Sequence, residues 1–191
     1  MPWIAGWGIA AVWIAFFAYW WLNARDVKPA TRTESPWIRF GVYGLPLLIA
    51  IGLLGPERWF GGWLGERFVT PTDLVLAVAL MLAVAGIALA IWARRILGPN
   101  WSGVVQLKQD HELIEAGPYR WIRHPIYTGL LLAFLGTALR TGEWRGLLAV
   151  LIVGLSFWRK LRLEERWLIE HFGERYEAYR KRSKALIPFV L

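Results

Sequence analysis

Two arginines and a histidine lie within the five residues before a proline, and this cluster is the first candidate for chemistry. The run from Glu115 to Gly129 reads EAGPYRWIRHPIYTG and contains Arg120, Arg123, His124 and Pro125. Proline favours the first turn of a helix, so we expect a helix to begin here with His124 near its cap. A helix N-terminus presents free backbone N–H groups, and the arginines add positive charge. The pattern predicts a site for a carboxylate or another anion.

Two adjacent carboxylates, Glu164 and Glu165, form the second candidate. They follow the last apolar run, and paired carboxylates near a low-dielectric boundary would attract a cation such as a sulfonium. The competing interpretation is that they balance neighbouring basic residues on a solvated helix face, through spacings of three and four. Residue pattern alone favours this second interpretation.

Other catalytic classes find little support in the chain. The three histidines do not have a spacing typical of a metal site, so no bound metal is predicted. The absence of cysteine excludes thiolate ligands, disulfides and a cysteine nucleophile. A Gly-x-Gly-x-x-Gly turn after a strand and a Gly-x-Ser-x-Gly elbow are both missing, so neither a doubly wound nucleotide-binding fold nor a serine hydrolase is indicated.

The elements that carry these residues are predicted to be membrane helices. Of the 191 residues, 57% are hydrophobic and 14 are Trp, which is too apolar and aromatic for an ordinary soluble domain. Three uncharged runs approach the length needed to cross a bilayer: Trp3 to Leu22, Phe40 to Pro56 and Leu74 to Ala93. We expect tryptophans near the predicted helix ends, such as Trp20 and Trp101, to form an interfacial belt.

Two shorter runs, Pro125 to Leu139 and Gly146 to Trp158, are predicted to form a helical hairpin with a turn at Thr141 and Gly142. Flanking arginines such as Arg145 would lengthen these helices by snorkelling, and whether either helix fully spans is left open. The fold class is therefore all-α, a polytopic integral membrane protein with about five transmembrane helices. Residues 1–191 are predicted to form a single domain, with three spans in 1–93 and a polar loop, the hairpin and the tail in 94–191.

Basic residues alternate between the predicted connections. Lys and Arg number four in 23–39, two in 57–73, five in 94–123, two in 140–145 and nine from 159 onward. This alternation predicts a protein of the cytoplasmic (inner) membrane, with its N-terminus outside and its C-terminus in the cytoplasm. The net charge of +8 then marks cytoplasmic loops, and nucleic acid is not expected as a partner. Apolar spacings of three and four over 161–182 predict a cytoplasmic amphipathic helix, bent near Gly173.

The run GPYRWIRHPIYTG, preceded by HELIEA and followed by EERWLIEHFGERYEAYRKR and LIP, resembles the isoprenylcysteine carboxyl methyltransferase family and its prokaryotic relatives. The resemblance covers roughly Leu97 to Pro188 and rests on several separated motifs in the same order and spacing. It implies a membrane enzyme that binds S-adenosyl-L-methionine in a cytoplasmic pocket. The loop before the RHP motif, the helix after it and the tail would form that pocket.

The resemblance also implies a role for individual positions. The cofactor-binding positions would be Gln106, His111, Glu112, Leu113, Ile114, Tyr119, His124, Pro125, Ile126, Tyr127, Glu164 and Glu165. Arg123 and Glu164 are expected to be catalytic, with Arg123 beside the methyl acceptor, where it would orient a substrate carboxylate. Lys160 is expected to contact substrate. Some relatives have an arginine there, and lysine provides a point charge instead of a bidentate fork.

The predicted function is therefore methyl transfer from S-adenosylmethionine to a lipophilic or lipid-modified substrate that enters from the bilayer, as in the isoprenylcysteine carboxyl O-methyltransferases. A phospholipid N-methyltransferase or a small-thiol S-methyltransferase would share the cofactor motif and differ in the acceptor pocket. A non-catalytic membrane scaffold whose basic tail binds anionic membrane lipids is the alternative from another class. The methyl acceptor and the oligomeric state stay open at this point.

Overall fold

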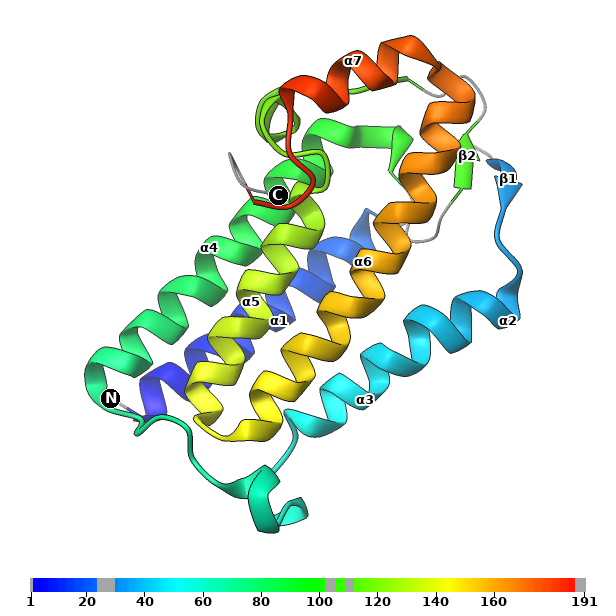
Figure 1. The fold of residues 1–191 in the computed structure, drawn as a ribbon. Helices are drawn as coiled ribbons and strands as arrows, with labels where there is room; N and C mark the ends of the chain where they lie inside the picture. Colours follow the sequence, from blue (N-terminus) through cyan, green and yellow to red (C-terminus); the bar gives the residue numbers. More distant parts are fainter. Residues whose placement is uncertain (1, 24–29, 102–105, 109–111, 188–191) are drawn as a thin grey trace.

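The computed structural model describes residues 2–23, 30–101, 106–108 and 112–187, and within them helices dominate (Figure 1). The helices are α1 (Pro2–Leu22), α2 (Pro36–Arg39), α3 (Leu45–Leu53), α4 (Asp73–Leu97), α5 (Pro125–Thr141), α6 (Trp144–Phe172) and α7 (Glu174–Arg182). Two short strands, β1 (Ala30–Thr33) and β2 (Gln106–Lys108), pair antiparallel near the α7 end of the bundle and were not predicted.

Among the residues that the structure describes, three helical segments are long and apolar enough to cross a membrane: Ala5–Leu22, Pro36–Leu53 and Asp73–Asn100. They correspond to the first three predicted spans. The predicted hairpin follows as α5, with 17 residues, and α6, with 29. The protein is an all-α integral membrane protein, as predicted, and the count of five crossings stays a prediction.

The second span is a helix with a π-helical segment, Phe40–Gly44, between α2 and α3. The cause is local, because Pro46 has no backbone N–H and cannot bond the carbonyl of Val42 four residues earlier. The Leu45 N–H instead donates to Phe40 O, and Val42 O accepts a hydrogen bond of 2.9 Å from Ser156 Oγ of α6. Interruptions of this kind are frequent at functional sites. This one brings the second span against α6.

Close approach to α4 fixes the position of α5. A Cβ added at Gly86 would lie 2.3 Å from Gly129 O, and one added at Gly136 would lie 2.4 Å from Ala79 O. Small residues therefore let the two backbones touch, as is common between membrane helices.

The hairpin turn is as predicted: α5 ends at Thr141 and Gly142 adopts a left-handed conformation, φ 71°.

The snorkelling predicted for Arg145 is wrong. Its side chain is only 3% exposed and forms an ion pair with Glu143. Its Nη1 also donates to the carbonyls of Leu53 and Gly55, at 2.6 and 2.7 Å. Carbonyls at a helix C-terminus lack helical partners, so the end of α3 offers acceptors that compete with water for the guanidinium. Arg145 thereby ties α3 to the hairpin.

The predicted cytoplasmic helix is not separate from the fifth span, because α6 continues without a break from Trp144 to Phe172. The predicted bend is present at Gly173, with φ 54°, after which α7 turns across the end of the bundle (Figure 1). A continuous α6 carries the side chains of Lys160, Glu164 and Glu165 rigidly from the apolar part of the bundle to its polar end.

Candidate active site

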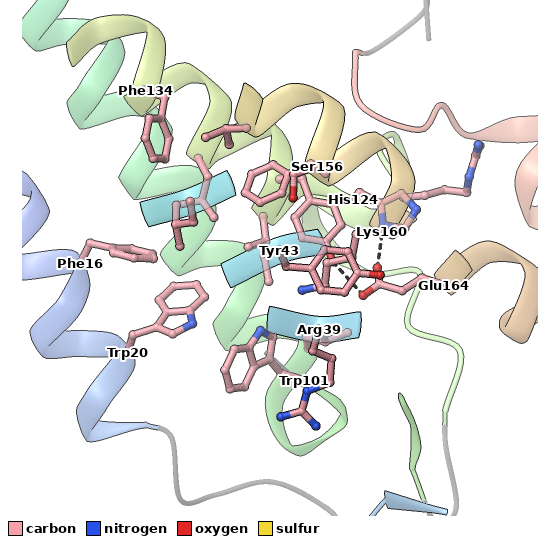
Figure 2. Close-up of a pocket in the computed structure, with 18 of the residues that line it drawn as sticks. Phe16, Trp20, Arg39, Tyr43, Trp101, His124, Phe134, Ser156, Lys160 and Glu164 are labelled. Atoms are coloured by element: carbon pink, nitrogen blue, oxygen red, sulfur yellow. Dashed lines mark hydrogen bonds and ion pairs between the residues drawn. The ribbon is translucent and has the colours of Figure 1, made fainter. Parts of the chain in front are cut away.

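A cavity of about 1020 Å³ lies among α1, the second span, α5 and α6. Its lining is mainly apolar, with polar groups at the α7 end, a composition typical of small-molecule sites. In Figure 2, aromatic side chains of α1 face it from one side, and polar groups gather on the opposite side. The labelled residues of these two groups are Phe16 and Trp20 on α1, and Tyr43, His124, Lys160 and Glu164 opposite.

Most of the predicted site residues meet at this cavity. Those that line it are Glu112, Leu113, Ile114, Tyr119, Arg123, His124, Ile126, Tyr127, Lys160 and Glu164. Pro125 is buried and begins α5, and Glu165 is buried in contact with Arg123 and His124. The backbone of Gln106 belongs to β2, and His111 lies outside the described residues.

His124 lies between the two carboxylates. Its Nδ1 is 3.5 Å from Glu164 Oε2, and its Nε2 is 3.3 Å from Glu165 Oε1. Tyr127 Oη donates a hydrogen bond of 2.7 Å to Glu164 Oε1, and its ring stacks on the imidazole with centroids 5.5 Å apart. The Glu164 side chain is 21% exposed, against 8% for Glu165. The Glu164 carboxylate is therefore open to the cavity, whereas the Glu165 carboxylate is enclosed within the cluster.

The cluster is charged despite its burial. Burial alone would lower the pKa of His124. Its hydrogen bonds with Glu164 and Glu165, together with their negative charges, instead raise that pKa above 6.5. Burial would likewise raise the pKa of both glutamates, whereas the hydrogen bonds and positive charges around them prevail. The pKa of Glu164 falls below 4.5, and that of Glu165 falls to about 2. Contacts within the cluster therefore favour the charged form of all three side chains.

Arg123 holds the C-terminal segment against this cluster. Its Nε donates to Glu165 Oε1 at 2.6 Å, and its Nη1 donates to Ser183 O at 2.6 Å and Arg180 O at 3.3 Å. The Arg123 backbone N–H donates to Lys184 O at 2.7 Å. A carboxylate of the chain itself thus meets the arginine for which an anion partner was predicted.

Lys160 faces the cavity between two aromatic rings. Its Nζ is 5.3 Å from the ring centroid of Tyr127 and 5.6 Å from that of Tyr43. Cation–π contacts of this kind stabilise a charged ammonium at a site where little water reaches it. The structure thus places Lys160 in the cavity wall beside both rings, and its contact with substrate stays a prediction.

Several lining residues were missed or assigned other roles by sequence reasoning. Tyr43 and Arg39 belong to the second span, which carries no recognised motif. Trp20 and Trp101 were predicted as interfacial belt residues, but they meet edge-on with centroids 5.7 Å apart in the cavity wall. For Tyr43 a signal was available, because a polar hydroxyl in an apolar span favours the bundle interior.

Known proteins match the part of the chain that builds this site. The profile of the phospholipid methyltransferase family matches residues 74–175. The protein-S-isoprenylcysteine O-methyltransferase of Schizosaccharomyces pombe is 35% identical over 96 residues, covering 49% of this chain and 41% of the relative. The enzyme of the same name from Saccharomyces cerevisiae is 31% identical over 122 residues, covering 62% and 51%. The chain thus spans about half the length of these curated relatives.

The fold also matches a solved structure, that of a eukaryotic intramembrane Ras methyltransferase, an isoprenylcysteine carboxyl methyltransferase. The TM-score is 0.61 at 24% identity, over 84% of this chain and 55% of the other. The helical arrangement is therefore shared with a membrane methyltransferase. The resemblance predicted from the motifs is confirmed, and since the family profile covers more than half of its residues, the chain belongs to the phospholipid methyltransferase family.

Proposed function

We propose that the protein transfers a methyl group from S-adenosyl-L-methionine to the carboxylate of a lipophilic, isoprenylcysteine-like substrate. The observation that carries the proposal is the juxtaposition of Glu164, His124 and Tyr127 at the polar end of an otherwise apolar cavity. A soluble substrate would not need such an extensive apolar lining, and a purely structural charge cluster would not need to open on a cavity. The similarity to isoprenylcysteine methyltransferases supports the same reaction class.

The residues present fit the methyl donor. Glu164 offers a partly exposed carboxylate beside the ring of Tyr127, a combination that attracts a sulfonium. The predicted loop positions Glu112, Leu113 and Ile114 line the same cavity and would hold the rest of the donor. When bound, S-adenosylmethionine supplies an electrophilic methyl group on a positively charged sulfur.

The remaining catalytic task falls to positioning. Lys160, held between two tyrosine rings, would attract the substrate carboxylate, and Arg123 would orient it from the cavity wall. Arg123 is itself fixed by Glu165 and the C-terminal carbonyls, so its guanidinium has a defined place. Alignment of a nucleophile at about 3 to 3.5 Å from its target supplies much of the rate of such displacements. The apolar lining keeps water scarce, which favours attack of an anion on a cation.

The membrane side of the cavity offers a route for the substrate. Phe17 on α1 and Ile51 on α3 both line the cavity and are 57% and 49% exposed on the bundle surface. A lipid tail would enter between these helices, while the donor would arrive from the end that carries α7. The alternating basic connections support a cytoplasmic location for that end in an inner membrane.

A methyl-transfer assay in detergent tests the proposal. Purified protein is incubated with isotopically labelled S-adenosylmethionine and N-acetyl-S-farnesylcysteine, phosphatidylethanolamine or a small alkyl thiol. Label in a base-labile ester of the farnesylcysteine is the expected result. Transfer to the phospholipid alone, or to the thiol alone, would show that this molecule class is the methyl acceptor instead of the isoprenylcysteine carboxylate. Folded protein that transfers label to none of them would contradict an enzymatic role and favour a lipid-binding scaffold.

A further inference from the structure

The cavity extends well beyond the space that the polar cluster needs. Along α5 its lining continues from Tyr127 to Thr137, and along α6 from Glu164 back to Val153. At about 1.5 Å per residue, both paths measure roughly 15 Å. The apolar arm, defined here as the part lined by Trp13, Leu47, Phe134, Thr137 and Val153, therefore reaches deep into the bundle.

Four helices close the apolar arm at a similar depth. Toward the hairpin end, the last residues of the lining are Trp13 on α1, Thr137 on α5, Val153 on α6, and Leu54 and Gly55 after α3. Phe134 and Val153 belong to one buried cluster, against which Trp13 and Leu54 pack. The arm consequently ends at a packed floor formed by side chains from every wall.

Trp13 is the fixed part of this floor. Its indole N–H donates a hydrogen bond of 3.0 Å to Thr137 Oγ1, which in turn donates to Ala133 O at 2.8 Å. Its ring meets Phe134 edge-on, with centroids 5.1 Å apart. A hydrogen-bonded polar group in apolar surroundings is costly to displace, so the indole cannot swing aside without leaving Thr137 without its donor. Trp13 thus links α1 to α5 through a hydrogen bond.

We propose that Trp13, locked to Thr137, sets the length of the lipid tail that the enzyme accepts. The inference rests on the proposed function and adds a specificity-determining residue to it. A tail that reaches the floor gains apolar contact along the whole arm, whereas the excess length of a longer tail must displace the indole or leave through the opening between α1 and α3, where it loses contact with the arm. Hydrophobic pockets typically discriminate such differences by tens of fold, because packed side chains yield little.

Competition between geranyl-, farnesyl- and geranylgeranyl-cysteine as methyl acceptors tests the proposal. Trp13→Ala is expected to raise kcat/KM for geranylgeranyl relative to farnesyl by about tenfold. The matched control is Trp7→Ala, since Trp7 lies on the same helix but is 73% exposed on its outer surface. Val153→Ala removes less volume from the floor and should shift the ratio the same way, so it serves if Trp13→Ala does not fold. An unchanged ratio in a folded floor variant overturns the proposal.

A second readout separates this inference from the reaction itself. A farnesylcysteine with a diazirine at the tail end is photolysed on the wild-type protein, and labelled peptides are located by mass spectrometry. Labelling of Trp13, Phe134 or Thr137 supports the floor even if no methyl ester forms, a result that would refute only the proposed function. Labelling confined to other segments overturns the floor even if methyl transfer proceeds.

Discussion

Glu143 and Arg145 at the hairpin end of the bundle are as deeply buried as His124 and Glu165 at the α7 end. The side chains are 2% and 3% exposed in the first pair, and 7% and 8% in the second. In the hairpin pair, however, Arg145 is bonded to Glu143 and to two backbone carbonyls, and neither residue is among the described residues that line the large cavity. The cluster of His124, Glu164 and Glu165 at the α7 end, called the α7 cluster below, instead opens to the cavity through Glu164.

This difference shows that burial of charge alone does not indicate function in a membrane bundle. A buried pair with every partner inside the protein holds elements together, and removing one member leaves the other uncompensated. A cluster in which one carboxylate stays partly exposed to a cavity has capacity left for a ligand. We therefore propose that Glu143 and Arg145 contribute to stability, and that Glu164 with its neighbours contributes to binding.

The sharpest way to break this comparison is to disrupt the hairpin pair. Glu143→Ala leaves Arg145 buried without its counter-charge, and the free energy of unfolding in detergent should fall by roughly 3 kcal/mol or more. Donor affinity of the folded fraction should not change. Glu57→Ala is the control, because Glu57 and Arg67 form an exposed pair with atoms 3.8 Å apart, which contributes little. A folded Glu143→Ala protein of normal stability that binds donor poorly would reverse the assignment.

The next largest effect is expected from Arg123→Ala. Because Arg123 is assigned to substrate orientation, turnover should fall by roughly 100-fold while donor affinity stays close to that of the wild type. Methyl-ester formation and calorimetric titration measure the two quantities. Arg120→Ala serves as the control, since Arg120 lies three residues earlier and is exposed. Parallel loss of donor binding in Arg123→Ala would mean that Arg123 supports the donor site through Glu165 and the C-terminal segment.

Lys160→Met should act mainly on the acceptor. Removing the ammonium between Tyr43 and Tyr127 is expected to raise KM for a carboxylate substrate by about tenfold, with a smaller change in kcat. Arg159→Met, one residue earlier on an exposed position of α6, provides the charge-matched control. An unchanged KM in Lys160→Met would remove Lys160 from the substrate site.

The smallest predicted effect concerns pH. Because the folded-state pKa of His124 is raised above 6.5, its contribution to stability is fully present below that pH and is lost as pH rises through the folded value. Glu165 contributes in the opposite direction, since its pKa is lowered to about 2 and its contribution disappears as pH falls from 4.5 toward that value. The free energy of unfolding should therefore fall at both acidic and alkaline pH, and His124→Gln should flatten only the fall on the alkaline side. An unaltered alkaline slope would contradict a charged His124.

Sequence reasoning located much of this arrangement. The lengths of apolar runs predicted the helices, glycine predicted the turn at Gly142 and the bend at Gly173, and the motifs brought Arg123, His124 and Glu164 to one end. These features depend on residues close in sequence or on charges that must leave lipid, so a local pattern is sufficient to reveal them.

The walls of the cavity were not predictable in the same way. In a bilayer every face of an apolar helix is acceptable, so composition does not indicate which side of α1 or α3 turns inward. Trp13 therefore looks like the other aromatic residues of its span until the packing is known. The burial of Arg145 was missed for a related reason, because its acceptors at Leu53 and Gly55 are distant in sequence.

Calorimetric titration of S-adenosylmethionine into detergent-purified protein tests the central claim most directly. The wild type is compared with Glu164→Gln, which keeps the shape but removes the charge, and with Glu170→Gln, which removes an exposed charge from the same helix. Saturable binding by the wild type and Glu170→Gln, weakened at least about 100-fold in Glu164→Gln, is the predicted result. Equal binding by all three proteins, or none by folded wild type, would contradict the assignment of the α7 cluster to the methyl donor.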